Sequence, residues 1–337
     1  MISPRYSALI VLGMIFSTVL LGANFVNAEE AHSFYKIKVA VTQPIIGKIL
    51  EEVFGDYVAV VSLIPPGVDP HHYEPPLNEV LDAIKNCEAI FTSGPHHLAI
   101  EDKIMQLSAE GYITIPVYTL DDYTRHGLRI LKIDDRENYH GVLMSYSGSK
   151  ALIETFLDFT SIKHPEVYAE MEKLADGYLS ALKSISEKAS LRFEGLKLAL
   201  YSPVLQYALH DVNASIELVL TGDPEIPPTI NELQTLYEYH KMKRIDLVII
   251  TDVDLRTDNK IEEYLQKNEI EYLRIDVLGK SPLEIYGQLA YSGFISNTLA
   301  FEPEKDTLLT YALYVSLTLN IILIVLVIAL VNKIKQS

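Results

Sequence analysis

Two adjacent histidines stand in the stretch GVDPHHYEPP, residues 67–76. Pro70 and Pro75 rule out a helix through this segment, so His71 and His72 lie on a stiff, irregular loop. Adjacent side chains of an extended segment point to opposite sides, so only one imidazole of the pair needs to face a binding site. A stiff loop also loses less entropy when it holds a ligand. The loop therefore suggests ligand binding, and a surface histidine pair without function is the alternative.

The cysteine content limits the chemistry that such a loop can take part in. Cys87 is the single cysteine of the chain, so neither an intramolecular disulfide nor a cysteine-based zinc site can form. Any metal ligands must therefore be His, Asp, Glu or hydroxyl oxygens.

Both ends of the chain carry apolar runs. Residues 1–28 contain one basic residue and a long apolar stretch ending in VNA, which predicts a signal peptide cleaved after Ala28. Residues 308–331 hold no charge, and as a helix they would reach about 36 Å, enough to cross a hydrocarbon core of about 30 Å. Lysines in residues 332–337 place that tail in the cytoplasm. We expect a single-pass protein of the cell membrane whose ectodomain lies outside the cytoplasm.

The part between signal and anchor is acidic. The chain has 45 acidic and 28 basic residues, and setting aside Arg5, Lys333 and Lys335 leaves 45 against 25, a net charge of −20. This charge excludes nucleic acid as a natural partner. An acidic surface attracts cations, and it is equally an ordinary means of staying soluble.

Strand-like and helical patterns alternate through the ectodomain, which predicts an α/β fold with mainly parallel sheets flanked by helices. The strand-like runs fall into two groups of four, at residues 36–42, 57–63, 88–93 and 112–118, and at residues 196–202, 215–220, 244–252 and 271–277. Between the groups, apolar residues at helical spacing predict one long helix over residues 165–195, opened by Pro165 and closed by Gly195.

These patterns divide the chain into six parts. They are a signal peptide (1–28), an N-terminal lobe (29–164), a rigid connecting helix (165–195), a C-terminal lobe (196–306), a transmembrane anchor (308–331) and a cytoplasmic tail (332–337). Two lobes joined by a stiff helix should keep a nearly fixed cleft, with the site at the carboxyl ends of the strands that face it. The histidine loop follows directly on such a strand.

The stretch VAVTQPIIGKILEEVFGDYVAVVSLIPPGVDPHHYEPPLNEV, followed by AIFTSGPHHLAIEDKI, resembles the metal-binding substrate-binding protein family of zinc and manganese ABC importers. That family includes the periplasmic zinc-binding protein and the manganese-binding adhesin-like lipoproteins. Its signature is a strand, a Gly-Asp turn, a second strand and a Pro-Gly-x-Asp-Pro-His-x-Tyr-Glu-Pro loop. The resemblance implies two rigid α/β lobes that hold one metal ion in the cleft between them.

Carried over position by position, the resemblance implies four metal-site residues. His71 follows Asp-Pro directly, His140 precedes a helix that begins near Ser147, and Asp276 stands at the end of its strand. Ser202 occupies the position where the family has His or Glu, and a neutral hydroxyl is a weak ligand, so water there is the alternative. The implied ion is Zn²⁺, with Mn²⁺ or Fe²⁺ as alternatives that accept the same donors.

The resemblance also implies a function and a partner. We expect a binding protein, not an enzyme, that captures the ion and delivers it to an ABC permease in the same membrane, with a monomeric ectodomain. One alternative is a membrane-anchored metal-dependent hydrolase, because a three-ligand site with a water resembles catalytic zinc; no HExxH or GxSxG motif supports it. The other is a family member that has lost metal binding and holds another ligand.

The remaining histidines have weaker motifs. The roles of His72, His96, His97 and His210 stay open, with His210 expected at the surface. Glu101 and the His96–His97 pair are expected at a wet loop rim, with hydrogen bonding to a ligand imidazole as the alternative. His126 lies among acidic residues and is expected on an exposed connection, with help in delivering cations as the alternative. His32, His164 and His240 have no motif around them and are expected at the surface.

Overall fold

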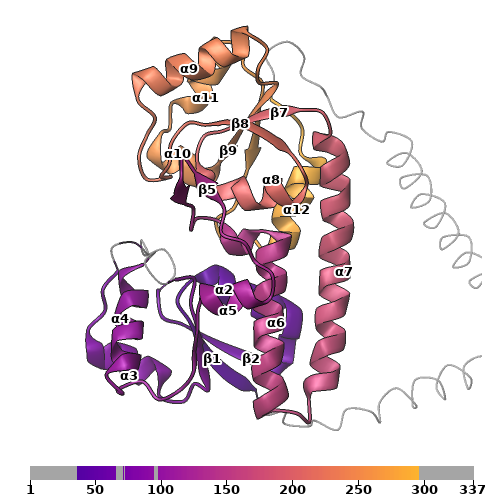
Figure 1. The fold of residues 1–337 in the computed structure, drawn as a ribbon. Helices are drawn as coiled ribbons and strands as arrows, with labels where there is room; N and C mark the ends of the chain where they lie inside the picture. The colour runs from indigo at the N-terminus through magenta and orange to yellow at the C-terminus, as the bar shows by residue number, and fades with distance from the viewer. Residues whose placement is uncertain (1–35, 66–70, 72, 95–97, 296–337) are drawn as a thin grey trace, which may run out of the picture.

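The computed structural model contains two α/β lobes, and a long helix runs beside both of them (Figure 1). It describes residues 36–65, 71, 73–94 and 98–295. Within these ranges, no helix is both long and apolar enough to cross a membrane. The predicted signal peptide (1–28) and anchor (308–331) lie outside the described residues.

The N-terminal lobe is built on a four-stranded parallel sheet of order β2-β1-β3-β4. Its strands are β1 (Ile37–Val41), β2 (Val58–Ser62), β3 (Ala89–Phe91) and β4 (Val117–Tyr118). Its helices are α2 (Pro44–Phe54), α3 (Leu77–Ile84), α4 (Ala99–Ala109), α5 (Leu120–Arg125) and α6 (Tyr146–Lys163), with 3₁₀ turns η1 (Gly55–Tyr57) and η2 (Val142–Met144). A short antiparallel pair, β5 (Lys132–Ile133) and β6 (Arg136–Glu137), leads toward the second lobe.

The C-terminal lobe repeats the same strand order, β8-β7-β9-β10, again with parallel pairing. Its strands are β7 (Lys197–Leu200), β8 (Ser215–Val219), β9 (Leu247–Thr251) and β10 (Tyr272–Ile275). Its helices are η3 (Pro203–Leu205), α8 (Gln206–Asp211), α9 (Ile230–Lys241), α10 (Asp252–Thr257), α11 (Ile261–Lys267) and α12 (Pro282–Tyr291). The expected alternation into two parallel α/β lobes is therefore confirmed.

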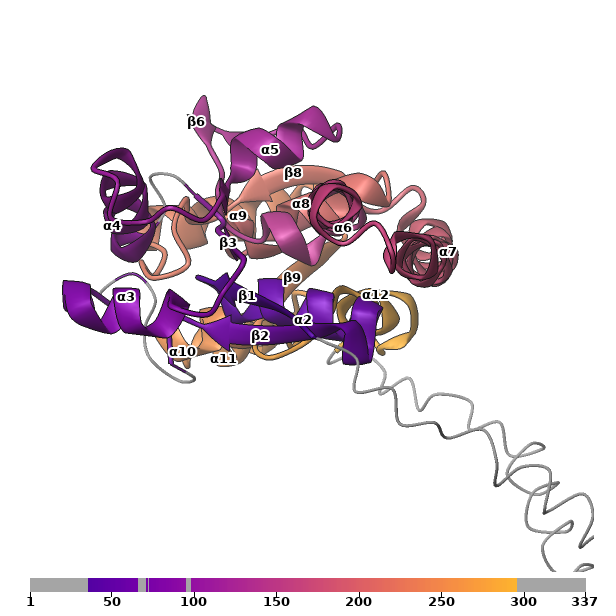
Figure 2. The ribbon, with the colours of Figure 1, turned by 90° about the horizontal axis from the view of Figure 1, so that it is seen from below.

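The connecting helix is α7 (Tyr168–Phe193), shorter at both ends than predicted. Pro165 does not open it, because α6 ends at Lys163 and residues 165–167 form a turn between the two helices. A buried stripe that includes Met171, Tyr178 and Leu182 faces the lobes, as the helical spacing predicts. Figure 2 looks along α6 and α7, which lie side by side.

The two lobes share one hydrophobic core. Buried side chains of both sheets, such as Val39 and Phe91 in the first and Leu200 and Ile249 in the second, belong to one continuous cluster that includes Leu182 of α7. Two smaller clusters fill the outer faces, one under α3 and α4 and one under α9 and α11. Because the central core runs through both lobes, their relative position is fixed by apolar packing as well as by α7.

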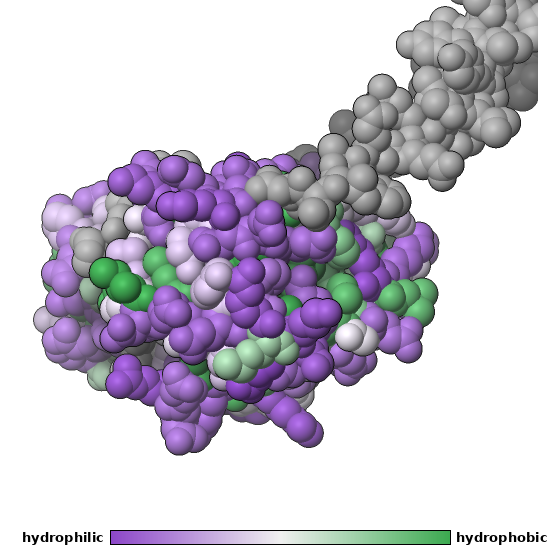
Figure 3. Space-filling view, turned by 90° about the horizontal axis from the view of Figure 1, so that it is seen from above, coloured by the Kyte–Doolittle hydropathy of each residue, from purple (hydrophilic) through white to green (hydrophobic). Residues whose placement is uncertain are grey.

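Hydrogen bonds across the lobe boundary add to this packing. The Tyr207 hydroxyl donates to the Asn138 carbonyl (2.6 Å), and the Tyr146 amide donates to the Tyr286 hydroxyl (3.0 Å). On another side, the Lys48 ammonium reaches a Glu284 carboxylate oxygen at 2.8 Å. The surface seen from above is mostly hydrophilic, with apolar residues in small separate areas (Figure 3), in keeping with the acidic composition.

Candidate metal site

His71 is the one residue of positions 66–72 that the structure describes. It follows β2, and its side chain is 25% exposed. Its ring centroid lies 5.9 Å from that of His140, with the ring planes inclined by 44°. Two histidines that are far apart in the sequence therefore lie close together. His72 lies outside the described residues.

His140 is placed by contacts with both lobes. Its amide donates to Asn138 Oδ1 (2.8 Å), and the Asn138 amide group in turn donates to Gln206 of the second lobe (2.8 Å). The next residue, Gly141, has a φ of +70° and lies so close to the second lobe that a Cβ there would be 1.7 Å from the Val204 carbonyl oxygen. Only glycine fits this approach, so the backbone beside His140 is fixed.

The electrostatics of His140 suit a metal ligand. Burial lowers the pKa of its imidazole to about 4, while the Asp223 carboxylate raises it and His71 lowers it further. The imidazole is therefore neutral near pH 7 and keeps the lone pair that a metal ion needs.

Two carboxylates that the sequence reasoning missed lie beside the histidine pair. Glu225 Oε1 is 3.6 Å from His71 Nε2, and the negative charge of Asp223 raises the pKa of His140. Both belong to the loop that follows β8. Their position after the carboxyl end of a parallel strand was the available signal. The local sequence TGDPE, however, is also typical of an ordinary turn.

Ser202 is buried at the end of β7, with 4% of its surface exposed, and no hydrogen bond of standard geometry reaches its hydroxyl among the described residues. It lies close to Asp254, which is 1% exposed. Burial raises the pKa of the Asp254 carboxyl to about 6, although hydrogen bonding to Ser202 and Thr251 lowers it. The Ser202 side chain thus contacts an internal carboxyl group.

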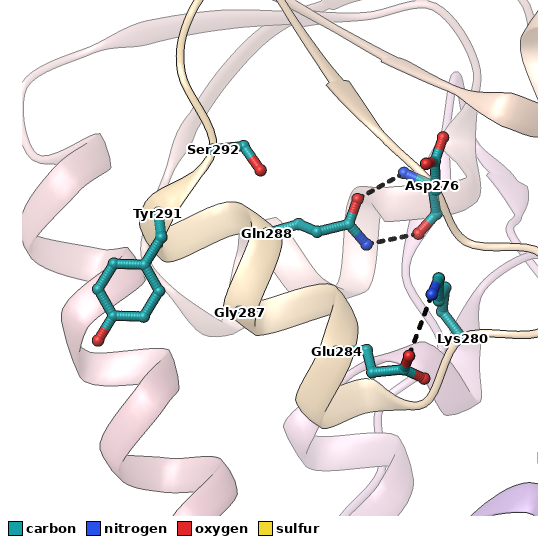
Figure 4. Close-up of a pocket in the computed structure, with 7 residues that line it drawn as sticks. All are labelled: Asp276, Lys280, Glu284, Gly287, Gln288, Tyr291 and Ser292. Carbon is teal, nitrogen blue, oxygen red and sulfur yellow. Dashed lines mark hydrogen bonds and ion pairs between the residues drawn. The ribbon is translucent and has the colours of Figure 1, made fainter. Parts of the chain in front are cut away.

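Asp276 follows β10, as predicted, but its carboxylate pairs with Arg274 Nε at 3.1 Å. Gln288 holds the Asp276 backbone by accepting from its amide (2.8 Å) and donating to its carbonyl (2.7 Å). Asp276 and Gln288 line a surface pocket together with Lys280 and Glu284 (Figure 4). Among the described residues, no group of three His, Cys, Asp or Glu side chains is close enough to hold an ion, so the structure brings together His71 and His140 but not the full predicted set.

Two expectations about other polar residues are wrong. His164 is not at the surface: its side chain is 12% exposed and its Nε2 lies 2.6 Å from Glu88 Oε2. Glu101 is not on a wet rim, because it is fully buried and its carboxylate accepts from Thr42 and Ser93.

The structure also places two more of the histidines. His210 is exposed on α8, as expected. His126 joins α5 to α6, with Nε2 3.1 Å from an Asp158 carboxylate oxygen. His96 and His97 lie outside the described residues.

Known proteins resemble the chain over most of this fold. A family model described as zinc-uptake complex component A, periplasmic, matches residues 39–296. The iron ABC transporter substrate-binding lipoprotein MtsA of Streptococcus pyogenes is 25% identical over 206 residues, which are 56% of this chain and 61% of MtsA. The manganese ABC transporter substrate-binding lipoprotein PsaA of Streptococcus mitis is 36% identical over 87 residues, 25% of this chain and 28% of PsaA. The chain thus spans less than two thirds of these curated relatives.

Solved structures show the same fold. The substrate-binding protein FpvC from Pseudomonas aeruginosa, in complex with Mn²⁺, superposes with a TM-score of 0.60 at 18% identity, over 76% of this chain and 96% of FpvC. A periplasmic metal binding protein from Candidatus Liberibacter asiaticus gives a TM-score of 0.60 at 17% identity, over 75% of this chain and 97% of that protein.

Proposed function

The chain belongs to the family of the periplasmic zinc-uptake component A, and we propose that it captures a divalent metal ion between its lobes and delivers it to an ABC permease. The family consists of substrate-binding components of transporters, not enzymes. Zn²⁺ is the proposed ion, with Mn²⁺ and Fe²⁺ as the next choices, since relatives are named for iron and manganese transport.

The observation that carries this proposal is the spacing of the His71 and His140 rings. An imidazole nitrogen binds zinc at about 2.1 Å, which puts the ring centroid about 3.2 Å from the ion, so two rings on one tetrahedral ion have centroids about 5–6 Å apart. The observed separation is 5.9 Å. The burial of His140 keeps its imidazole neutral, so binding does not have to displace a proton near pH 7.

The sequence predicts the rest of the ligand set. Asp276 is the predicted carboxylate ligand, and Ser202 contributes weakly or through a water, because a hydroxyl is a poorer zinc ligand than imidazole or carboxylate. We further propose that the ectodomain is a monomer. The predicted signal peptide (1–28) and anchor (308–331) would keep it outside the cytoplasm and close to the permease, which raises the effective concentration of the loaded protein.

Metal-dependent melting of the detergent-solubilised full-length protein tests the proposal. A ligand at 100 times its Kd stabilises the folded state by about 2.7 kcal/mol, so Zn²⁺ should raise the melting temperature of the wild type. His71→Ala and His140→Ala should abolish most of that rise, and His210→Ala, which alters an exposed histidine of α8, should keep it. A wild type that shows no rise with Zn²⁺, Mn²⁺ or Fe²⁺ would mean that this family member no longer binds a metal.

A further inference from the structure

The loop after β8 presents a carboxylate to the histidine pair. Glu225 Oε1 lies 3.6 Å from His71 Nε2, and the Glu225 side chain is 41% exposed. We propose that Glu225 is the carboxylate ligand of the ion held by His71 and His140. This inference rests on the proposed function and replaces the predicted ligand Asp276 with a residue from a different strand end.

The separation of the two atoms fits a shared ion better than a direct bond. A nitrogen and an oxygen joined by a hydrogen bond are about 2.7–3.2 Å apart, shorter than the 3.6 Å between His71 and Glu225. Two donor atoms about 2.1 Å from one ion at a tetrahedral angle are about 3.4 Å apart. The pair is therefore spaced almost as two ligands of one metal ion are.

The backbone that carries Glu225 is held on both sides. The Glu225 amide donates to Asp223 Oδ1 (2.9 Å), and the Thr221 hydroxyl donates to the Asp223 carbonyl (2.8 Å). The Thr257 hydroxyl, at the end of α10, donates to the Pro224 carbonyl (2.7 Å). The loop is thus fixed while the exposed Glu225 side chain can still change rotamer, which is the movement needed to close three ligands around an ion.

Asp276 is in a poorer position to bind the same ion. Its carboxylate is paired with the Arg274 guanidinium at 3.1 Å, and it borders the pocket that contains the Lys280 ammonium group (Figure 4). Ligation would require the carboxylate to leave its arginine. The carboxylate of Glu225 instead faces the imidazole of His71, and that imidazole is itself a proposed ligand.

A set of two imidazoles and one carboxylate accepts Zn²⁺ with a water in the fourth position, and it also suits Mn²⁺ and Fe²⁺. The Asp223 carboxylate is close enough to interact electrostatically with His140. Its negative charge therefore favours a divalent cation beside the histidines. It also orients the Glu225 backbone, which makes Asp223 a positioning residue and not a ligand.

Titration of the full-length protein in detergent with Zn²⁺ and Mn²⁺ separates the two carboxylates. Glu225→Gln keeps the size of the side chain and removes its charge, and we expect it to raise the Zn²⁺ Kd about tenfold or more. Asp276→Asn should leave the Kd within about threefold of the wild type. Glu217→Gln is the matched control, because it removes the same charge from an exposed position on β8 itself; it should also leave the Kd within that range.

Cobalt provides a second readout. Co²⁺ bound by the wild type should show the visible absorption of a low-coordinate site, and Glu225→Gln should change that spectrum while Asp276→Asn should not. If Asp276→Asn weakens Zn²⁺ binding and Glu225→Gln does not, the inference is wrong and the proposed function stands on the ligands predicted from the sequence. If the wild type binds neither Zn²⁺ nor Mn²⁺, both are wrong.

Discussion

Replacement of Asp254 by asparagine should remove a loss of stability that the wild type suffers as the pH rises to neutral. The Asp254 side chain is 1% exposed. One carboxylate oxygen, Oδ2, accepts from the Thr251 amide (2.7 Å) and hydroxyl (2.9 Å), as the third residue of the capping box that opens α10. No hydrogen bond of standard geometry reaches the other oxygen, Oδ1, among the described residues. An asparagine can keep the first set of bonds and direct its amide group toward the Ser202 hydroxyl.

The magnitude follows from the pKa. Burial raises the pKa of Asp254 from 3.8 to about 6, so its carboxyl contributes stability that is fully present below pH 3.8 and is lost as the pH rises through 6. A rise of this size corresponds to about 3 kcal/mol, of which about 2 kcal/mol are lost between pH 4.5 and pH 8. An asparagine side chain cannot ionise, so that loss should be missing from the Asp254→Asn variant.

Urea unfolding followed by circular dichroism, at several pH values from 4.5 to 8, measures this effect. The free energy of unfolding of Asp254→Asn minus that of the wild type should increase by about 2 kcal/mol over the range, whatever constant offset the amide introduces. Asp56→Asn, at a side chain that is 94% exposed, serves as the control and should show a difference that changes little with pH. If the Asp254→Asn difference also changes little with pH, ionisation of the buried carboxyl does not destabilise the fold and the reasoning fails.

Two further changes test the packing between and within the lobes. Gly141→Ala should lower the free energy of unfolding by about 3 kcal/mol or more, because its Cβ would meet a backbone carbonyl of the second lobe at 1.7 Å. The control Gly127→Ala, at a φ of +86° with open space around the added Cβ, should cost only about 1 kcal/mol. Equal losses for the two variants would contradict the close approach at Gly141. His164→Ala should cost about 1–3 kcal/mol, because it leaves the Glu88 carboxylate without its partner at 2.6 Å. His126→Ala, whose partner Asp158 is 70% exposed, should cost less than about 1 kcal/mol. Thermal unfolding of both histidine variants measures the two losses, and a reversed order would refute the argument.

The strands and their pairing direction were predictable because each buried parallel strand is a short apolar run. The runs at residues 36–42 and 57–63 correspond to β1 and β2 within one residue at each end. The run at 112–118 was less informative, since only Val117–Tyr118 forms a strand. The preceding residue, Pro116, accepts from the Ile90 amide but has no amide hydrogen to donate to β3.

The shared core was not predictable, for a different physical reason. Phe91 and Ile249 each read as the apolar residue of an ordinary strand, and nothing in either run says which neighbour it meets. Only the packed fold shows that both lobes contribute to one cluster through α7. The lobes are therefore less independent than the boundaries at residues 164 and 196 suggested.

The site was predictable in part. His71 could be singled out by its stiff loop and His140 by its resemblance to a known motif, and their rings do lie together. Glu225 was missed because a glutamate in a Pro-rich turn is usually a solvated residue. The partner of His164, Glu88, lies 76 positions away in the sequence, so no local pattern could reveal that pair either.

The continuous core also bears on how an ion reaches the site. Rotating the lobes apart would expose side chains from both sheets, at about 25 cal/mol for each Å² of apolar surface, and would break bonds such as that between the Tyr146 amide and the Tyr286 hydroxyl. The residues around the ion are different, because His71 and Glu225 stand on loops with partly exposed side chains. Reorienting these side chains costs far less free energy than separating the lobes. Metal entry and release are therefore expected to depend on the side chains of His71 and Glu225, and exchange rates should respond to substitutions of these two residues before they respond to changes in α7.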